Sequence, residues 1–275
     1  MPPFAPVERT TVDGIEIAFR RAGSGPPLLL LHGIPTSSRI WDAVGAELVG
    51  GFDAIAPDML GYGESAKPVD RDVSMAAQAR LMPGLLDALG VERAIVVGHD
   101  LGGAVAQWLA VDAPDRVAGL MLVDTVSFDS WPIARMRVLR RIAPPFARRW
   151  PRRWFAAFER SLRRYVPEGE PREALRASLA AWSADRAGAE AFMRNARAMD
   201  PRITLEVAPR LAGLALPAHV VWGRDDPFQK VRWAERVQAA IPGATLTVLD
   251  GGHFLPWDRP LEVAAEIRAL ADRVG

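Results

Sequence analysis

One stretch, Ala94 to Ala104, constrains the fold more than any other part of the sequence. It begins with a short apolar, β-branched run that is typical of a buried strand. It ends at a pair of glycines that open a segment of good helix formers. Between them lies Gly98-His99-Asp100-Leu101-Gly102, whose glycines permit a turn too sharp for a Cβ. The pattern predicts a strand, a tight turn with Asp100 at its tip, and a helix.

Two interpretations of Asp100 are open at this point. The glycine spacing alone would allow an exposed aspartate that caps the N-terminus of the following helix. The same turn can also present a nucleophile above the edge of a sheet. The choice depends on whether the rest of the chain supplies a base, an acid and backbone donors.

Composition indicates one large α/β domain with an insertion. The chain has 275 residues, of which 49% are hydrophobic and 24% charged. Cysteine is absent, which excludes disulfides and thiolate metal sites. The sequence contains neither a signal-peptide core nor an apolar run of membrane-spanning length, so we expect a cytoplasmic protein without membrane insertion.

Positive charge is concentrated in one segment. Residues 129–205 contain 17 Arg, no Lys and eight acidic residues, a local net charge of +9 in a chain of formal net charge +1. Trp150 and Trp154 lie among these arginines, so a nucleic-acid or membrane surface is one interpretation. We favour solvated helix faces whose arginine stems cover apolar rings, and we expect no nucleic-acid partner.

Strands alternate with helices over most of the chain. Residues 10–21 predict a hairpin that turns at Asp13-Gly14. Further strands are expected at residues 28–31, 52–56, 94–97, 119–123, 218–222 and 245–249, and helices at residues 41–49, 74–89, 104–113, 231–240 and 261–274. This order predicts an α/β fold in which a mostly parallel eight-stranded sheet carries helices on both faces.

The alternation stops near Ser130 and resumes at Ala218. The segment between them is rich in Arg, Ala and Trp, contains several prolines and has no β run. We therefore expect residues 128–205 to form an all-helical cap inserted into a core made of residues 1–127 and 206–275.

Three side chains at predicted strand ends form a candidate catalytic set. Parallel sheets collect their reactive groups at the carboxyl ends of the strands. Asp100 is the candidate nucleophile, His253 the general base, and Asp226 the acid that orients the base. Asp225 and Asp124, the latter also at a strand end, remain alternatives for the acid.

Backbone donors and the remaining histidines complete this interpretation. The turn after His32-Gly33 can aim the N–H of Ile34 at Asp100, and with the N–H of Leu101 it would form an oxyanion hole. His32 and His99 each lie beside a glycine turn, and we expect both to be structural. His219 begins a strand and is expected to be non-catalytic.

Three segments together resemble a known branch of enzymes. Residues 32–41, the loop Pro57-Asp58 with Gly61-Tyr62-Gly63-Glu64-Ser65, and the Asp100 turn resemble the haloalkane dehalogenase and epoxide hydrolase branch of the α/β-hydrolase superfamily. The likeness covers roughly residues 10–127 and 210–275. It implies the α/β-hydrolase fold, a small-molecule substrate, and catalysis without a cofactor or metal. Nothing in the sequence distinguishes a monomer from a homodimer.

An aspartate nucleophile limits the kinds of substrate that the enzyme can attack. Attack on a carboxylic ester would give an anhydride, which has no advantage over the ester formed by a serine. Attack on a halide-bearing carbon or an epoxide gives an ordinary ester on Asp100, which water activated by His253 can hydrolyse. We therefore expect a haloalkane or epoxide substrate.

The leaving-group residues of this branch are not matched. Haloalkane dehalogenases usually have Trp after the nucleophile and often Asn after His-Gly, where this chain has Leu101 and Ile34. Epoxide hydrolases of this kind use two cap tyrosines, whereas this cap has only Tyr165, a candidate for the substrate pocket. Tyr62 belongs to the core. The segment at residues 32–41 favours the dehalogenase-like reaction slightly.

Two further classes of function stay open. One is an esterase or lyase scaffold in which Asp100 replaces serine. The other is a ligand-binding protein without catalysis. The presence of both His253 and Asp226 favours an enzyme, because a binding protein does not need the complete set.

Overall fold

The computed structural model describes residues 4–274, and its centre is one mixed sheet. The eight strands lie in the order β1-β2-β4-β3-β5-β6-β7-β8. β1 pairs antiparallel with β2 and β2 with β4, and all the other pairings are parallel. The strands are β1 (Val7–Val12), β2 (Ile15–Ala22), β3 (Pro27–Leu31), β4 (Asp53–Pro57), β5 (Ala94–His99), β6 (Val117–Val123), β7 (Ala218–Gly223) and β8 (Thr245–Leu249).

The predicted hairpin opens the chain. Val12 pairs with Ile15 across Asp13 and Gly14, whose φ angles are 51° and 74°. Positive φ at both turn positions matches the right-handed twist of the flanking strands, and Asp-Gly tolerates it best. The hairpin therefore forms where the sequence predicts it.

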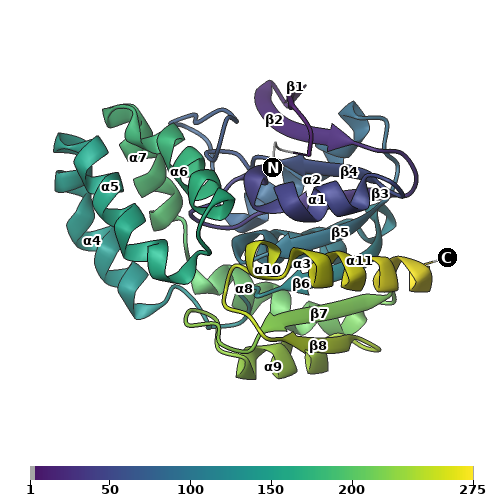
Figure 1. The fold of residues 1–275 in the computed structure, drawn as a ribbon. Helices are drawn as coiled ribbons and strands as arrows, with labels where there is room; N and C mark the ends of the chain where they lie inside the picture. The colour runs from purple at the N-terminus through teal and green to yellow at the C-terminus, as the bar shows by residue number, and fades with distance from the viewer. Residues whose placement is uncertain (1–3, 275) are drawn as a thin grey trace.

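Helices cover both faces of the sheet (Figure 1). α1 packs against α11 on one face, and α2 packs against α3 on the other. The described residues contain eleven α-helices: α1 (Asp42–Leu48), α2 (Met75–Ala88), α3 (Leu101–Asp112), α4 (Ala134–Arg149), α5 (Pro151–Leu162), α6 (Glu170–Ser183), α7 (Arg186–Arg197), α8 (Pro201–Val207), α9 (Arg232–Ala240), α10 (Leu255–Asp258) and α11 (Pro260–Val274).

Residues 128–205, here called the helical insert, follow β6 and contain no strand. Helices α4 to α7 form a group at one end of the sheet, on the left of Figure 1. The expected boundary at residue 205 falls inside α8, which packs on α3 of the core. No helix within residues 4–274 is both long enough and apolar enough to span a membrane.

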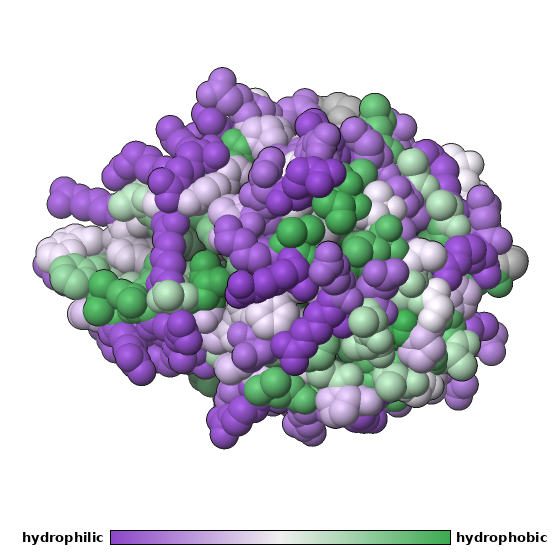
Figure 2. All heavy atoms as spheres, turned by 90° about the horizontal axis from the view of Figure 1, so that it is seen from below, coloured by the Kyte–Doolittle hydropathy of each residue, from purple (hydrophilic) through white to green (hydrophobic). Residues whose placement is uncertain are grey.

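The arginines of the insert lie mostly on exposed helix positions. Along α4 they flank an exposed apolar row at four-residue spacing, which Figure 2 shows on the left as green among purple side chains. The row consists of Val138, Ile142, Phe146 and Trp150, each between 47% and 62% exposed. The opposite face of α4 is buried through Ala143 and Ala147. α4 is therefore amphipathic, with its arginines at the edge of solvent.

Candidate active site

Asp100 occupies the tip of a strained turn between β5 and α3. Its backbone has φ 53° and ψ −116°, a conformation that L-residues rarely adopt. A Cβ on Gly98 would lie 2.4 Å from the carbonyl oxygen of Gly102, and a Cβ on Gly102 would lie 2.3 Å from that of Leu31. The chain passes so close to itself that both positions require glycine.

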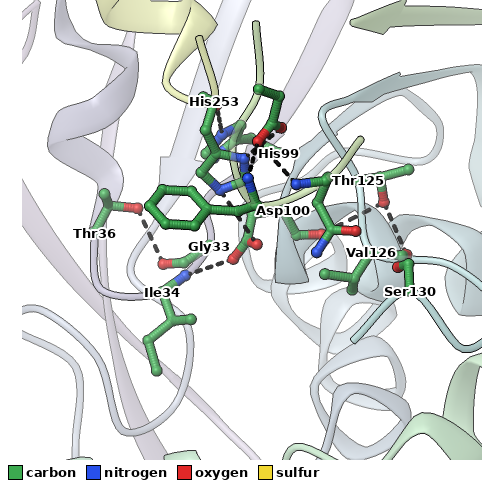
Figure 3. A network of polar contacts seen from close by, with 12 residues as sticks. Gly33, Ile34, Thr36, His99, Asp100, Thr125, Val126, Ser130 and His253 are labelled. Atoms are coloured by element: carbon green, nitrogen blue, oxygen red, sulfur yellow. Dashed lines mark hydrogen bonds and ion pairs between the residues drawn. The ribbon is translucent and has the colours of Figure 1, made fainter. Parts of the chain in front are cut away.

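The Asp100 carboxylate lies between a backbone donor and an imidazole (Figure 3). Its Oδ1 accepts a hydrogen bond from the N–H of Ile34 at 2.9 Å, and its Oδ2 lies 3.5 Å from Nε2 of His253. Burial alone would raise the pKa of Asp100, but contact with His253 and the Ile34 N–H together lower it below its usual value. Asp100 is therefore ionised at neutral pH.

His253 is held on its other side by Asp226. Nδ1 of His253 lies 2.8 Å from Oδ2 of Asp226. Oδ1 of Asp226 accepts the backbone N–H groups of Phe228 at 2.6 Å and Gln229 at 2.8 Å. Because Nδ1 donates to this carboxylate, Nε2 is the nitrogen that faces Asp100. Burial lowers the pKa of His253, but the negative charges of Asp226 and Asp100 outweigh this effect. The pKa of His253 therefore lies well above its usual value.

Among the described residues, neither of the two alternative acids is hydrogen-bonded to His253. Asp124, at the end of β6, accepts the N–H of Gly223 at 2.7 Å through Oδ1, and its buried Oδ2 has no partner among the described residues. Burial, followed by the charge of Asp226, raises the pKa of Asp124 well above its usual value. Asp225 is exposed to solvent. Of the three aspartates, only Asp226 is hydrogen-bonded to the imidazole.

The other three histidines hold the backbone or a strand edge. His32 contacts the Gly33 carbonyl through Nδ1 at 2.9 Å and accepts the Met59 N–H through Nε2 at 3.0 Å. His99 donates through Nε2 to the carbonyl of His253 at 2.8 Å, and burial, followed by the charge of His253, lowers the pKa of His99 to about 3. His219 bonds to side chains at the opposite end of β7.

A cavity of about 70 Å³ lies above Asp100 and His253. Loops after five strands of the core and three parts of the helical insert meet around it. Its lining is mainly apolar and consists of Ile34, Pro35, Asp100, Val126, Phe228, Gln229, His253 and Phe254 from the core, with Trp131, Ile133, Arg135, Met136, Phe158, Leu162 and Met199 from the insert.

Two residues singled out by the sequence do not line this cavity. Leu101 begins α3, and its side chain is fully buried in the core. Tyr165 lines a separate hollow beside Asp225 and packs its ring edge-on against Phe228, with ring centroids 4.8 Å apart. This second hollow also touches His253.

Most residues of the cavity wall were not predicted from the sequence. Trp131, Phe158 and Gln229 carry no motif, and they line one cavity only because the insert folds back over the strand ends. The position of Gln229 three residues after Asp226, in the loop that turns toward His253, was the one available signal.

Comparison with known proteins gives the same fold. Residues 26–260 match the family model described as alpha/beta hydrolase fold. A crystal structure of an alpha/beta hydrolase fold protein from Burkholderia ambifaria superposes with a TM-score of 0.86, at 28% identity, covering 94% of this chain and 96% of that one.

Relatives in sequence include enzymes of the expected branch. An uncharacterized protein of Mycobacterium tuberculosis is 36% identical, covering 91% of this chain and 76% of the relative. Haloalkane dehalogenase 2 of the same organism is 31% identical, covering 92% and 89%. An epoxide hydrolase of Caballeronia sordidicola is 27% identical, covering 93% and 90%. The chain therefore belongs to the alpha/beta hydrolase fold family and is a hydrolase.

Proposed function

We propose that this hydrolase cleaves a carbon–halogen bond through an ester formed on Asp100. The observation that carries the proposal is the ionised Asp100 carboxylate at the floor of a small apolar cavity, with His253 3.5 Å from its Oδ2. A carboxylate in such surroundings is a competent nucleophile toward a saturated carbon. The apolar walls suit a small haloalkane.

The two oxygens of Asp100 have different surroundings, which supports separate roles. Oδ2 would attack the carbon, the carbon–halogen bond would break, and the halide would leave with the bonding electrons. Oδ1, held by the Ile34 N–H, would remain the carbonyl oxygen of the ester. That N–H would then stabilise the oxyanion formed in the second step, with the Leu101 N–H as the expected second donor.

The second step would release the product. Nε2 of His253 takes a proton from water, and the water oxygen attacks the carbonyl carbon of the Asp100 ester. Collapse of the tetrahedral intermediate releases the alcohol and restores the carboxylate. Asp226 would hold the imidazole and stabilise its cation through the 2.8 Å hydrogen bond. The overall reaction consumes one water and yields an alcohol, a halide and a proton.

The charge on His253 fits this order of steps. The Asp100 carboxylate helps to raise the pKa of His253 in the free enzyme. Ester formation removes that negative charge, so the pKa of His253 falls when a neutral base is needed. The first step uses the carboxylate alone and does not need the base.

The polar groups around the cavity favour a halide over an epoxide. Opening an epoxide creates a strongly basic alkoxide that needs an acid, a role that tyrosines can fill. Neither Tyr62 nor Tyr165 lines the cavity above Asp100. A halide leaves as a stable anion and needs no proton. We also propose that the helical insert serves as the cap of this cavity.

Trapping the ester tests this function. With His253→Gln, incubation with 1-bromopropane should add a propyl group to the protein, located on Asp100 by peptide mass spectrometry. Propylene oxide, the matched epoxide, should add little or no hydroxypropyl group. Asp100→Asn is the control that should remain unmodified. An unmodified His253→Gln protein with both reagents would reject the proposal, and a hydroxypropyl adduct alone would favour the epoxide hydrolase reaction.

The esterase alternative has a test of its own. If Asp100 replaces a serine on an esterase scaffold, Asp100→Ser should hydrolyse p-nitrophenyl acetate while the parent enzyme releases no halide. We expect the parent to release bromide from 1-bromopropane instead.

A further inference from the structure

The halide formed in the proposed reaction needs a hydrogen-bond donor that the family pattern does not supply, and this inference rests on that proposed function. Four cavity-lining side chains carry N–H groups: Trp131, Arg135, Gln229 and His253. The Nε1 of Trp131 already donates to Thr204 Oγ1 at 2.6 Å. The two ring nitrogens of His253 face Asp100 and Asp226. Two donors, Arg135 and Gln229, are left.

Gln229 is buried with its carboxamide unused. The residue is 2% exposed, and its backbone is fixed at both polar atoms. Its N–H donates to Asp226 Oδ1 at 2.8 Å, and its carbonyl accepts Trp222 Nε1 at 2.8 Å. The side chain is different: its Oε1 is buried without a hydrogen-bond partner. Within residues 4–274 the hydrogen bonds of Gln229 involve its backbone N–H and carbonyl, and none involves its Nε2.

An unpaired carboxamide in this position calls for a ligand. Leaving a buried polar group without a partner destabilises the folded protein, so most such groups in native structures are paired with protein, water, an ion or a ligand. Gln229 lines the same cavity as Asp100 and His253. Because no protein group holds either end of the amide, its N–H₂ can turn toward a ligand in the cavity.

Arg135 is a weaker candidate for this role. It is only partly buried, it donates to Ser161 Oγ at 2.5 Å, and it also borders an outer groove along α4. Because Arg135 borders both the cavity and the outer surface, water screens the charge of its guanidinium group.

We propose that the carboxamide of Gln229 binds the halide that leaves when Asp100 is alkylated. As the Asp100 oxygen–carbon bond forms and the carbon–halogen bond breaks, negative charge moves onto the halogen. The N–H of Gln229 donates a hydrogen bond to the charged halogen. This hydrogen bond is stronger in the transition state than in the neutral substrate. No proton is transferred.

The choice of an amide also defines the leaving group. An amide N–H donates a hydrogen bond but does not give up its proton at neutral pH. It therefore assists a leaving group that is stable as an anion and cannot complete the opening of an epoxide. Gln229 makes the site selective for halides within the compounds that Asp100 can attack.

The test measures the first step alone. In the His253→Gln background, we compare the rate of propyl-ester formation from 1-bromopropane with and without Gln229→Met. Methionine keeps the length of the side chain and removes the N–H groups. Loss of a hydrogen bond to a charged group predicts a decrease of about 10- to 100-fold. Circular dichroism and thermal unfolding show whether the variant keeps its fold.

A matched control separates the donor from the substitution. Gln238 lies on α9 outside the cavity, where its Nε2 donates to the Ala244 carbonyl at 3.2 Å. Gln238→Met should leave the rate of ester formation unchanged. An equal rate for Gln229→Met and its background would overturn the inference, and so would a decrease seen only in Arg135→Met.

Halide binding gives a second readout that does not depend on turnover. Titration of the parent enzyme with sodium bromide at constant ionic strength should quench tryptophan fluorescence, since Trp131 lines the cavity. Gln229→Met should weaken bromide binding at least 10-fold. If no ester forms in any protein, the proposed function fails, and the bromide titration still decides whether Gln229 holds an anion. Equal bromide affinities would refute the inference.

Discussion

At the scale of single residues, two buried aspartates at neighbouring strand ends have very different surroundings. Asp226 accepts hydrogen bonds from the His253 imidazole and from two backbone N–H groups. Asp124 accepts one backbone N–H, and its second oxygen has no partner among the described residues. Sequence alone offered both as acids because both follow strands. Only their three-dimensional contacts distinguish them.

Isosteric substitution should separate the two carboxyl groups in function. Asp226→Asn removes the charge that stabilises the imidazolium and favours the wrong tautomer of His253. We expect hydrolysis of the Asp100 ester to slow by roughly 10³-fold or more, so that the ester accumulates. Asp124→Asn should change this step by less than about 3-fold, because Asp124 has no hydrogen bond to His253 and asparagine keeps the acceptor for the Gly223 N–H. Rapid-quench mass spectrometry measures both. A comparable loss in Asp124→Asn would assign it the orienting role.

The raised pKa of Asp124 also predicts a change in stability. Between its usual pKa of 3.8 and its raised folded value, Asp124 is protonated in the folded protein and ionised in the unfolded chain, so stability falls as pH rises through this window. Asp124→Asn removes this penalty and keeps the acceptor for Gly223. At pH 7 its Tm should exceed that of the parent by at least about 2 °C.

Thermal unfolding from pH 4.5 to pH 8 provides the control for this effect. The Tm difference should shrink toward pH 4.5, where the unfolded carboxyl begins to take up its proton. A difference that does not vary with pH would mean that packing, not ionisation, separates the two proteins.

At the scale of elements, sequence predicted much of the core because local rules decide it. The hairpin at Asp13-Gly14 and the buried strand at residues 28–31 formed as expected, since turn chemistry and apolar runs act locally. The predicted helix at residues 41–49 instead begins as a 3-10 turn at Ser38 and becomes α-helical at Asp42. Most of the cavity wall could not be predicted, because residues such as Gln229 and Phe158 line the same cavity only through packing between segments distant in the chain.

The turn that carries Asp100 should tolerate an added methyl group poorly. A Cβ at Gly102 would lie 2.3 Å from the Leu31 carbonyl oxygen, which belongs to the backbone of a central strand and cannot move aside. We expect Gly102→Ala to lower the free energy of unfolding by about 1–3 kcal/mol or more, and to displace Asp100.

Gly50 provides the matched control for this substitution. It is exposed, and a Cβ there would meet nothing within 4 Å. Gly50→Ala should change stability by less than about 0.5 kcal/mol. Urea unfolding of both variants measures the difference, and equal stabilities would show that the strand-to-helix turn relaxes easily.

At the scale of the whole molecule, the helical insert is joined to the core through a few directed contacts. The Gly61 carbonyl accepts hydrogen bonds from Trp182 Nε1 at 2.9 Å and from Asn195 Nδ2 at 3.0 Å. Ser37 and Ser178 share a buried hydrogen bond of 2.7 Å. These contacts hold α6 and α7 against loops of the core. Because α5 packs on α6 and α4 packs on α7, and α4 and α5 line the cavity, the shape of the cavity depends on these contacts.

Asn195, the only asparagine of the chain, should therefore help to hold the helical insert in position on the core. Asn195→Ala removes one of the two donors to Gly61 and leaves a small void at a site that is 1% exposed. We expect a loss of about 1–3 kcal/mol, with faster amide exchange in α6 and α7 and unchanged exchange in β5 and β6. Arg186→Ala, on the exposed start of α7, is the control and should leave both exchange patterns unchanged.

Because the insert supplies about half of the cavity wall, KM for 1-bromopropane should rise when the insert is held less firmly on the core. Equal acceleration of exchange in the sheet and in the insert would instead mean that the molecule opens as one cooperative unit.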